Sequence, residues 1–145
     1  GEPVMVFSTP GHTDDSISFH VGSCLITGDT LFNGTVGNCF SGDLEGFYQS
    51  VKRLTRYPSE TIVYAGHDYV EYAMQFAKLI EPDNHHIDLF LKRYSFHHVF
   101  STLADEQKMN PYLRFNEKNL VARLKREGLS VETEFDRFKG VMGLS

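Results

Sequence analysis

Three residues of this chain pair metal-binding side chains with short, distinctive surroundings: His12 in TPGHT, Asp29 in TGDTLF and His67 in YAGHDY. Each follows an apolar, strand-like run, so each is expected where a strand ends. Two imidazoles and a carboxylate are ligands that suit zinc, iron or manganese. The chemistry that this set predicts is the activation of water by a bound metal ion.

Each of the three residues also has a purely structural interpretation. His12 could be a turn histidine, Asp29 could accept backbone N–H bonds beside a glycine, and His67 could pack at the start of a helix. The joint occurrence of the three strings, each after a strand, favours the metal site over these separate roles.

Composition excludes several classes of function. The chain has 145 residues, 41% of them apolar, which is enough for the core of one ordinary domain. A formal charge of −5 without clustered Lys and Arg argues against a nucleic-acid surface. No apolar run approaches the length of a membrane span, and no signal-peptide pattern opens the chain. Two cysteines cannot build a disulfide framework, so we expect a reducing compartment, the cytoplasm.

The elements that must position these residues change from strands to helices along the chain. Short apolar runs predict strands over residues 4–7, 16–21, 23–27 and 61–64. The glycine-rich residues 32–42 predict a loop, after which Ser41 or Asp43 caps a helix that Pro58 ends.

From residue 69 onward, apolar residues recur at helical spacing. The pattern predicts helices over residues 69–80, 87–96 and 117–127, and a short one capped by Ser101 or Thr102. Residues 129–145 are mixed, and no element is predicted there. We place a domain boundary near residue 80, between residues 1–80 and 81–145.

The three strings resemble the metallo-β-lactamase superfamily. The later runs Ser101-Thr102-Leu103 and Asn110-Pro111-Tyr112-Leu113-Arg114 resemble glyoxalase II, the hydroxyacylglutathione hydrolase. The resemblance implies an α/β fold: the C-terminal half of an αββα sandwich, one sheet with helices, followed by a helical glutathione-binding domain. Family members carry an earlier T-H-x-H-x-D-H string, and none precedes Glu2. We therefore expect a fragment whose isolated chain is inactive.

The mechanism that the resemblance implies uses two divalent metal ions, zinc first, with iron or manganese as alternatives. Asp29 would bridge the two ions, with His12 on one and His67 on the other. A metal-bound hydroxide would attack the thioester of S-2-hydroxyacylglutathione, such as S-lactoylglutathione, and release glutathione and a 2-hydroxy acid.

The resemblance also implies residues that contact the substrate. Arg114 and Lys118 would hold a glutathione carboxylate, and Tyr69 would contact the glutathione backbone. Without the NPYLR string, Arg114 and Lys118 would be interpreted as surface charges. The family commonly has a basic residue at the position of Asn38, which keeps hydrogen bonding and loses the charge. We therefore expect weaker glutathione affinity, or a related thiol.

Two other functions stay open. A persulfide dioxygenase of the same superfamily shares His12, Asp29 and the HDY string but uses a single iron, and such enzymes generally lack an NPYLR-like helical appendage. A non-catalytic binding or assembly module is the second, because three ligands cannot fill two metal sites. The uncovered face of one sheet predicts self-association, or pairing with the missing N-terminal half.

Overall fold

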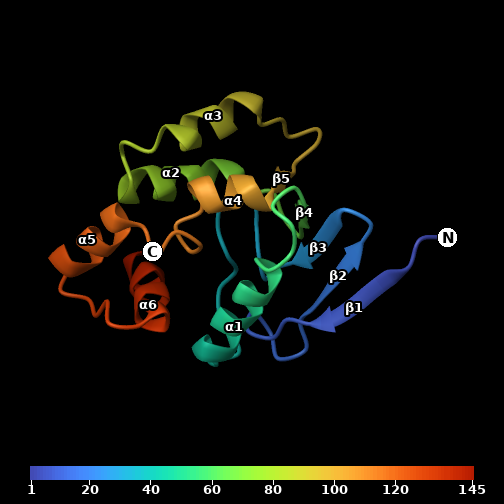
Figure 1. Ribbon diagram of the computed structural model, residues 1–145, viewed down its shortest axis with the longest axis horizontal. Coiled ribbons are helices and arrows are strands. Elements are labelled where there is room, and N and C mark those ends of the chain that lie inside the picture. Colours follow the sequence, from blue (N-terminus) through green and yellow to red (C-terminus); the bar gives the residue numbers. More distant parts are fainter.

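One five-stranded sheet and six helices make up the computed structural model, which describes residues 1–145 (Figure 1). The strands lie side by side in their order along the chain. They are β1 (Val4–Ser8), β2 (Ile17–Val21), β3 (Cys24–Gly28), β4 (Ile62–Ala65) and β5 (Ser101–Thr102). This architecture confirms the predicted α/β class, with one sheet and a helical C-terminal region.

The directions of the strands determine where the predicted ligands meet. β1, β2 and β3 form an antiparallel meander, and β4 pairs parallel to β3. β1, β3 and β4 therefore run in the same direction, and their carboxyl ends share one edge of the sheet. His12, Asp29 and His67 each follow one of these three strands, so the fold delivers all three to that edge.

The sheet has one buried face and one open face. On the buried face, Phe7, Leu25 and Val63 pack with the apolar side of helix α1 (Leu44–Leu54). The open face carries a row of apolar side chains that the structure leaves partly or largely exposed: Val4, Val6, Ile17, Phe19 and Ile26. We call these five residues the open sheet face.

Helix α1 links the parallel strands β3 and β4, and local signals set its start. The Asp43 carboxylate accepts a hydrogen bond from the backbone N–H of Gly46 (2.9 Å), which satisfies a donor of the first turn. Phe47, Val51 and Leu54 recur on one side and are buried. Of the two predicted caps, Asp43 is confirmed.

The remaining helices form two groups (Figure 1). The helices α2 (Val70–Ile80), α3 (His85–Arg93) and α4 (Leu103–Met109) share a small apolar cluster. The helices α5 (Lys118–Arg126) and α6 (Glu134–Leu144) pack against each other, and α6 also packs against α1. The domain boundary near residue 80 stays a prediction. Helix α2, which precedes that boundary, packs with α3 and α4, which follow it. No helix combines the length and the apolar character that crossing a membrane requires.

Most predicted elements are confirmed, and the differences have physical reasons. The helix predicted to reach residue 96 ends at Arg93, and the two-residue strand β5 was not predicted. Helix α6 fills part of the segment for which no element was predicted. Its start is a capping box of Thr133 and Asp136, but Gly140 and Gly143 weaken its helical preference. Packing compensates, because Phe138 and Val141 are fully buried.

We expect Phe138→Ala to lower the free energy of unfolding by about 3–5 kcal/mol, because it leaves a cavity in the core. The Phe138 ring has no exposed surface and lies near the rings of Phe47, Tyr48 and Phe115. Urea unfolding followed by circular dichroism measures the change. The matched control Phe96→Ala removes a ring that is 72% exposed and should stay within about 0.5 kcal/mol of the parent. Equal stabilities of the two variants would contradict this account of α6.

Candidate metal centre and adjoining pocket

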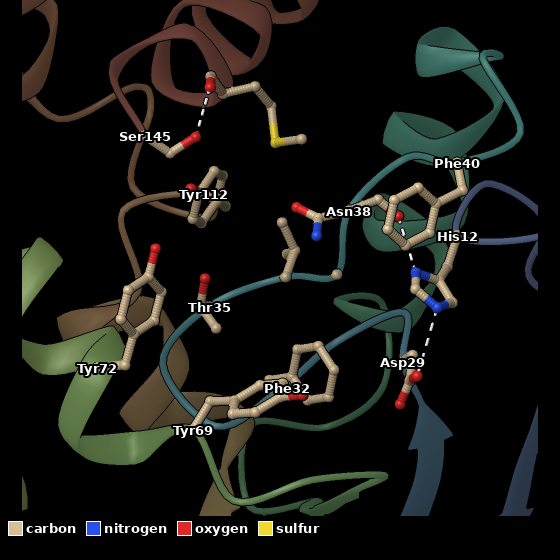
Figure 2. Close-up of a pocket in the computed structure, with 13 residues that line it drawn as sticks. His12, Asp29, Phe32, Thr35, Asn38, Phe40, Tyr69, Tyr72, Tyr112 and Ser145 are labelled. Carbon is tan, nitrogen blue, oxygen red and sulfur yellow. Dashed lines mark hydrogen bonds and ion pairs between the residues drawn. The ribbon is translucent and has the colours of Figure 1, made fainter.

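His12 and His67 both approach one oxygen of Asp29 at the carboxyl edge of the sheet. The Nε2 atom of His12 lies 3.3 Å from Oδ2 of Asp29, and Nε2 of His67 lies 3.6 Å from the same oxygen. Figure 2 shows His12 and Asp29 facing each other at one side of a pocket. The three predicted ligands are therefore brought together.

A backbone carbonyl determines which nitrogen of His12 is free to bind. The Nδ1 atom of His12 lies 2.8 Å from the carbonyl oxygen of Asn38 (Figure 2). Because a carbonyl oxygen can only accept a hydrogen bond, Nδ1 must carry the proton. In the neutral ring, the lone pair of Nε2 then points toward the Asp29 carboxylate. A metal cation between them would be bound by both groups.

These side chains fit a bound dication in donor type and in pairwise spacing. Ligand atoms about 2.1 Å from a tetrahedral zinc ion lie about 3.4 Å from one another. The distances of 3.3 and 3.6 Å agree with this spacing. Over the whole chain, however, no group of three or more His, Cys, Asp or Glu side chains is arranged so that it could hold a metal ion. The two distances show that one carboxylate oxygen of Asp29 lies between the imidazoles of His12 and His67.

Two glycines allow the chain to close around Asp29. A Cβ atom on Gly66 would collide with the Asp29 carboxylate, and one on Gly37 would collide with its backbone carbonyl. Gly37 also lies against the ring of His12. Both positions therefore need the absence of a side chain, which explains Gly66 in the YAGHDY string and Gly37 in the glycine-rich loop.

The segment that carries His67 is held from the helical region. Asp68 accepts hydrogen bonds from the backbone N–H of Val70 and from the hydroxyl of Tyr94, at the end of α3. The hydrogen bond to Asp68 raises the pKa of Tyr94 to about 12. The His67 ring stacks on Tyr69, with ring centroids 5.1 Å apart and planes at 15°.

A cavity of about 920 Å³ opens beside His12 and Asp29. Phe32, Phe40, Tyr69, Tyr72 and Tyr112 supply aromatic surfaces to its wall (Figure 2). Thr35, Asn38 and Ser145 add polar groups, and Val36, Gly37 and Met142 complete the lining. A space of this size can hold a small-molecule ligand.

Of the four predicted substrate contacts, two line the pocket and two do not. Tyr69 and Asn38 line the pocket. Arg114 does not, because its guanidinium pairs with both carboxylate oxygens of Glu81 (2.6 and 2.9 Å) and donates to the Gln107 carbonyl (3.0 Å). Lys118 is an exposed residue at the start of α5, and it does not line the pocket either.

Among the lining residues that sequence reasoning missed are Tyr72, Tyr112, Met142 and Ser145. Tyr72 follows Tyr69 by three residues, and residues at this spacing lie on the same side of a helix. Tyr112 belongs to the NPYLR string, in which only Arg114 was predicted to contact the substrate. Met142 and Ser145 belong to the segment in which no element was predicted.

The glycine-rich loop contacts a fully buried carboxylate, Glu106 of α4. Its oxygens accept hydrogen bonds from the backbone N–H of Gly34 (2.9 and 3.2 Å) and from the Asn110 amide (2.9 Å). Burial raises the pKa of Glu106 to about 7, although hydrogen bonds from Asn110, Gly34 and Ser101 act in the opposite direction.

Two family models match the chain in succession. The model of the metallo-beta-lactamase superfamily matches residues 1–67, and the model of the hydroxyacylglutathione hydrolase C-terminus matches residues 68–141. A curated hydroxyacylglutathione hydrolase from Idiomarina loihiensis is 37% identical over 133 residues, which cover 88% of this chain and 53% of the relative. The chain spans about half the length of the curated relatives it matches.

Solved structures show the same fold. The crystal structure of ETHE1 from Myxococcus xanthus has a TM-score of 0.56 and 27% identity, and the match covers 96% of this chain and 55% of that one. A structure of TTHA1623 in a di-iron-bound form has a TM-score of 0.52 and 26% identity, with coverage of 76% and 42%.

We expect the stability of the protein to fall as the pH rises from about 4.5 to about 7, because of Glu106. Its pKa is higher in the folded state than in the unfolded chain, so the folded state is favoured while the carboxyl is protonated. The loss is at most about 1.4 kcal/mol per pH unit. Urea unfolding at several pH values measures it against Glu106→Gln, which cannot ionise. Parallel pH profiles for the parent and Glu106→Gln would disprove this origin.

Proposed function

Since the chain belongs to the hydroxyacylglutathione hydrolase family of the metallo-β-lactamase superfamily, as its motifs predicted, we propose that it serves metal-dependent hydrolysis of S-2-hydroxyacylglutathione thioesters. The observation that carries the proposal is the shared approach of His12 and His67 to Asp29, beside a cavity of about 920 Å³. The relative from Idiomarina loihiensis carries the corresponding name.

The chain's own residues would hold and orient the metal ions. We propose two divalent ions, with His12 and His67 on separate ions and Asp29 shared between them. Zinc, iron and manganese all suit these donors. Bound dications lower the pKa of a water ligand to about 7 and polarise a carbonyl oxygen. The Asn38 carbonyl would keep the Nδ1 proton of His12 in place, so that Nε2 stays available as a ligand.

The aromatic pocket would bind the thiol part of the substrate. Tyr69 and Asn38 are proposed contacts because they line the cavity. Arg114 would have to leave Glu81 to reach a substrate carboxylate, and that would strand a buried carboxylate. We therefore propose that Arg114 supports the NPYLR turn, while Tyr112 of the same turn faces the substrate. Lys118 stays a predicted carboxylate contact.

A chimeric enzyme tests the proposal. We would replace the matched 133 residues of the Idiomarina loihiensis hydrolase with this chain, reconstitute the chimera with zinc, and measure loss of S-lactoylglutathione. We expect hydrolysis, and we expect Asp29→Asn to reduce bound metal and to lower kcat/KM at least about 100-fold, because a shared ligand is lost.

The matched control for the chimera is Asp88→Asn, which removes a carboxylate that pairs with Lys78 on the surface. It should keep both the metal and the activity. If the chimera purified without added zinc retains one iron and consumes oxygen, the persulfide dioxygenase would be supported instead. A folded, metal-free chimera without activity would support a non-catalytic module.

We also propose that two copies of the chain associate through the open sheet face. Val4 and Val6 are both 55% exposed, and Ile26 is 43% exposed. These side chains follow one another across neighbouring strands on the same face. Apolar sheet faces pack against each other at about 10 Å, and such contact would remove this surface from water.

For this association, light scattering after size-exclusion chromatography should show a dimer that dissociates on dilution. Val6→Lys combined with Ile26→Lys should give a monomer, because two charges would be buried in an apolar contact. The control Leu79→Lys changes a residue of α2 that is 70% exposed and should leave the dimer intact. A parent chain that is monomeric at every concentration would refute the proposal.

A further inference from the structure

One structural link between the helical region and the candidate metal centre is Glu106, a residue that the proposed mechanism does not use. Its side chain is fully buried in α4. It accepts hydrogen bonds from Gly34 of the glycine-rich loop and from Asn110 at the end of its own helix. An apolar residue would fill such a position at lower cost. The burial of a carboxylate here is explained by the hydrogen-bond donors that it satisfies.

Glu106 holds the tip of the loop. The backbone N–H of Gly34 donates to both of its oxygens, at 2.9 and 3.2 Å. Gly34 has a φ of +92°, and a Cβ atom there would collide with the end of Met74 in α2. The tip is thus packed against α2 and hydrogen-bonded to α4. Removal of the carboxylate would leave a buried N–H without an acceptor.

Asn110 extends the same support to the next residue of the loop. Its amide donates to Glu106 Oε1 (2.9 Å) and to the carbonyl of Thr35 (3.2 Å). The loop is closed on itself by the N–H of Phe32, which donates to the Thr35 carbonyl (3.0 Å). The Gly37 N–H donates to the Thr30 carbonyl (3.3 Å). Little freedom is left between the tip and Asn38.

The end of this loop carries a backbone carbonyl that contacts His12 of the candidate metal centre. The carbonyl of Asn38, four residues after Gly34, accepts the Nδ1 proton of His12 at 2.8 Å. We propose that Glu106 is a positioning residue: through Gly34 and Asn110 it fixes the loop over residues 31–38, so that the Asn38 carbonyl holds the His12 ring with Nε2 toward Asp29. The relevance of this arrangement to catalysis rests on the proposed function, whereas the hydrogen-bonded chain does not.

Exchange of the His12 Nδ1 proton with water tests the proposal. This proton is followed by NMR in the chain without metal or substrate, so the result is independent of hydrolase activity. In Glu106→Met, which keeps length but accepts no hydrogen bond, we expect exchange about fivefold faster, the ratio that corresponds to about 1 kcal/mol. In Glu106→Gln, the amide oxygen can still accept from Gly34 and Asn110, so exchange should match the parent.

Two further variants separate positioning from general loss of stability. Ile87→Ala opens a cavity in the cluster that joins α2, α3 and α4, and no residue of the loop over residues 31–38 belongs to that cluster. It should lower stability and leave exchange at His12 unchanged. If Glu106→Met does not fold, Glu106→Asp withdraws the carboxylate by one methylene and should also speed exchange. Exchange at the parent rate in a folded Glu106→Met or Glu106→Asp, or equally fast exchange in Ile87→Ala, overturns the proposal.

Discussion

The common direction of β1, β3 and β4 is the constraint on which the rest of the structure depends. Because these strands run the same way, three short loops end at one edge of the sheet and bring His12, Asp29 and His67 together. A slip of one residue in any of these pairings would turn side chains to the other face of the sheet. The buried face, packed against α1, makes such a slip costly.

The candidate metal centre is one side of a pocket whose other side comes from the helices. The predicted ligands lie in the loops that follow the strands, whereas Tyr69 at the start of α2, Tyr72 of α2 and Tyr112 of the NPYLR turn come from the helical region (Figure 2). Met142 comes from α6. The glycine-rich loop passes between these parts. It lines the cavity, packs against α2, and receives support from Glu106 and Asn110 of the helical region. The helical region therefore supports the glycine-rich loop by hydrogen bonds and packing, in addition to forming part of the pocket wall.

Local chemistry was sufficient to predict most elements and the three residues that meet at the carboxyl edge of the sheet. The cap at Asp43 and the glycine-rich loop depend on residues close together in the chain, and both are observed. Arg114 marks the limit of such reasoning. Its charge and motif indicate a carboxylate partner, and the structure supplies one in Glu81, a residue 33 positions earlier. No local pattern distinguishes an internal carboxylate from that of a substrate.

The amino-acid sequence by itself determined the family, the strand ends that carry the predicted ligands, and the helical character of the C-terminal region. These follow from motifs and from the spacing of apolar residues, which are properties of neighbouring positions. Only the tertiary structure decided the partner of Arg114, the protonated nitrogen of His12, the wall of the pocket and the burial of Glu106. Each of these depends on hydrogen-bond partners and on exclusion of water by residues distant in the chain, and such contacts exist only after the segments have packed.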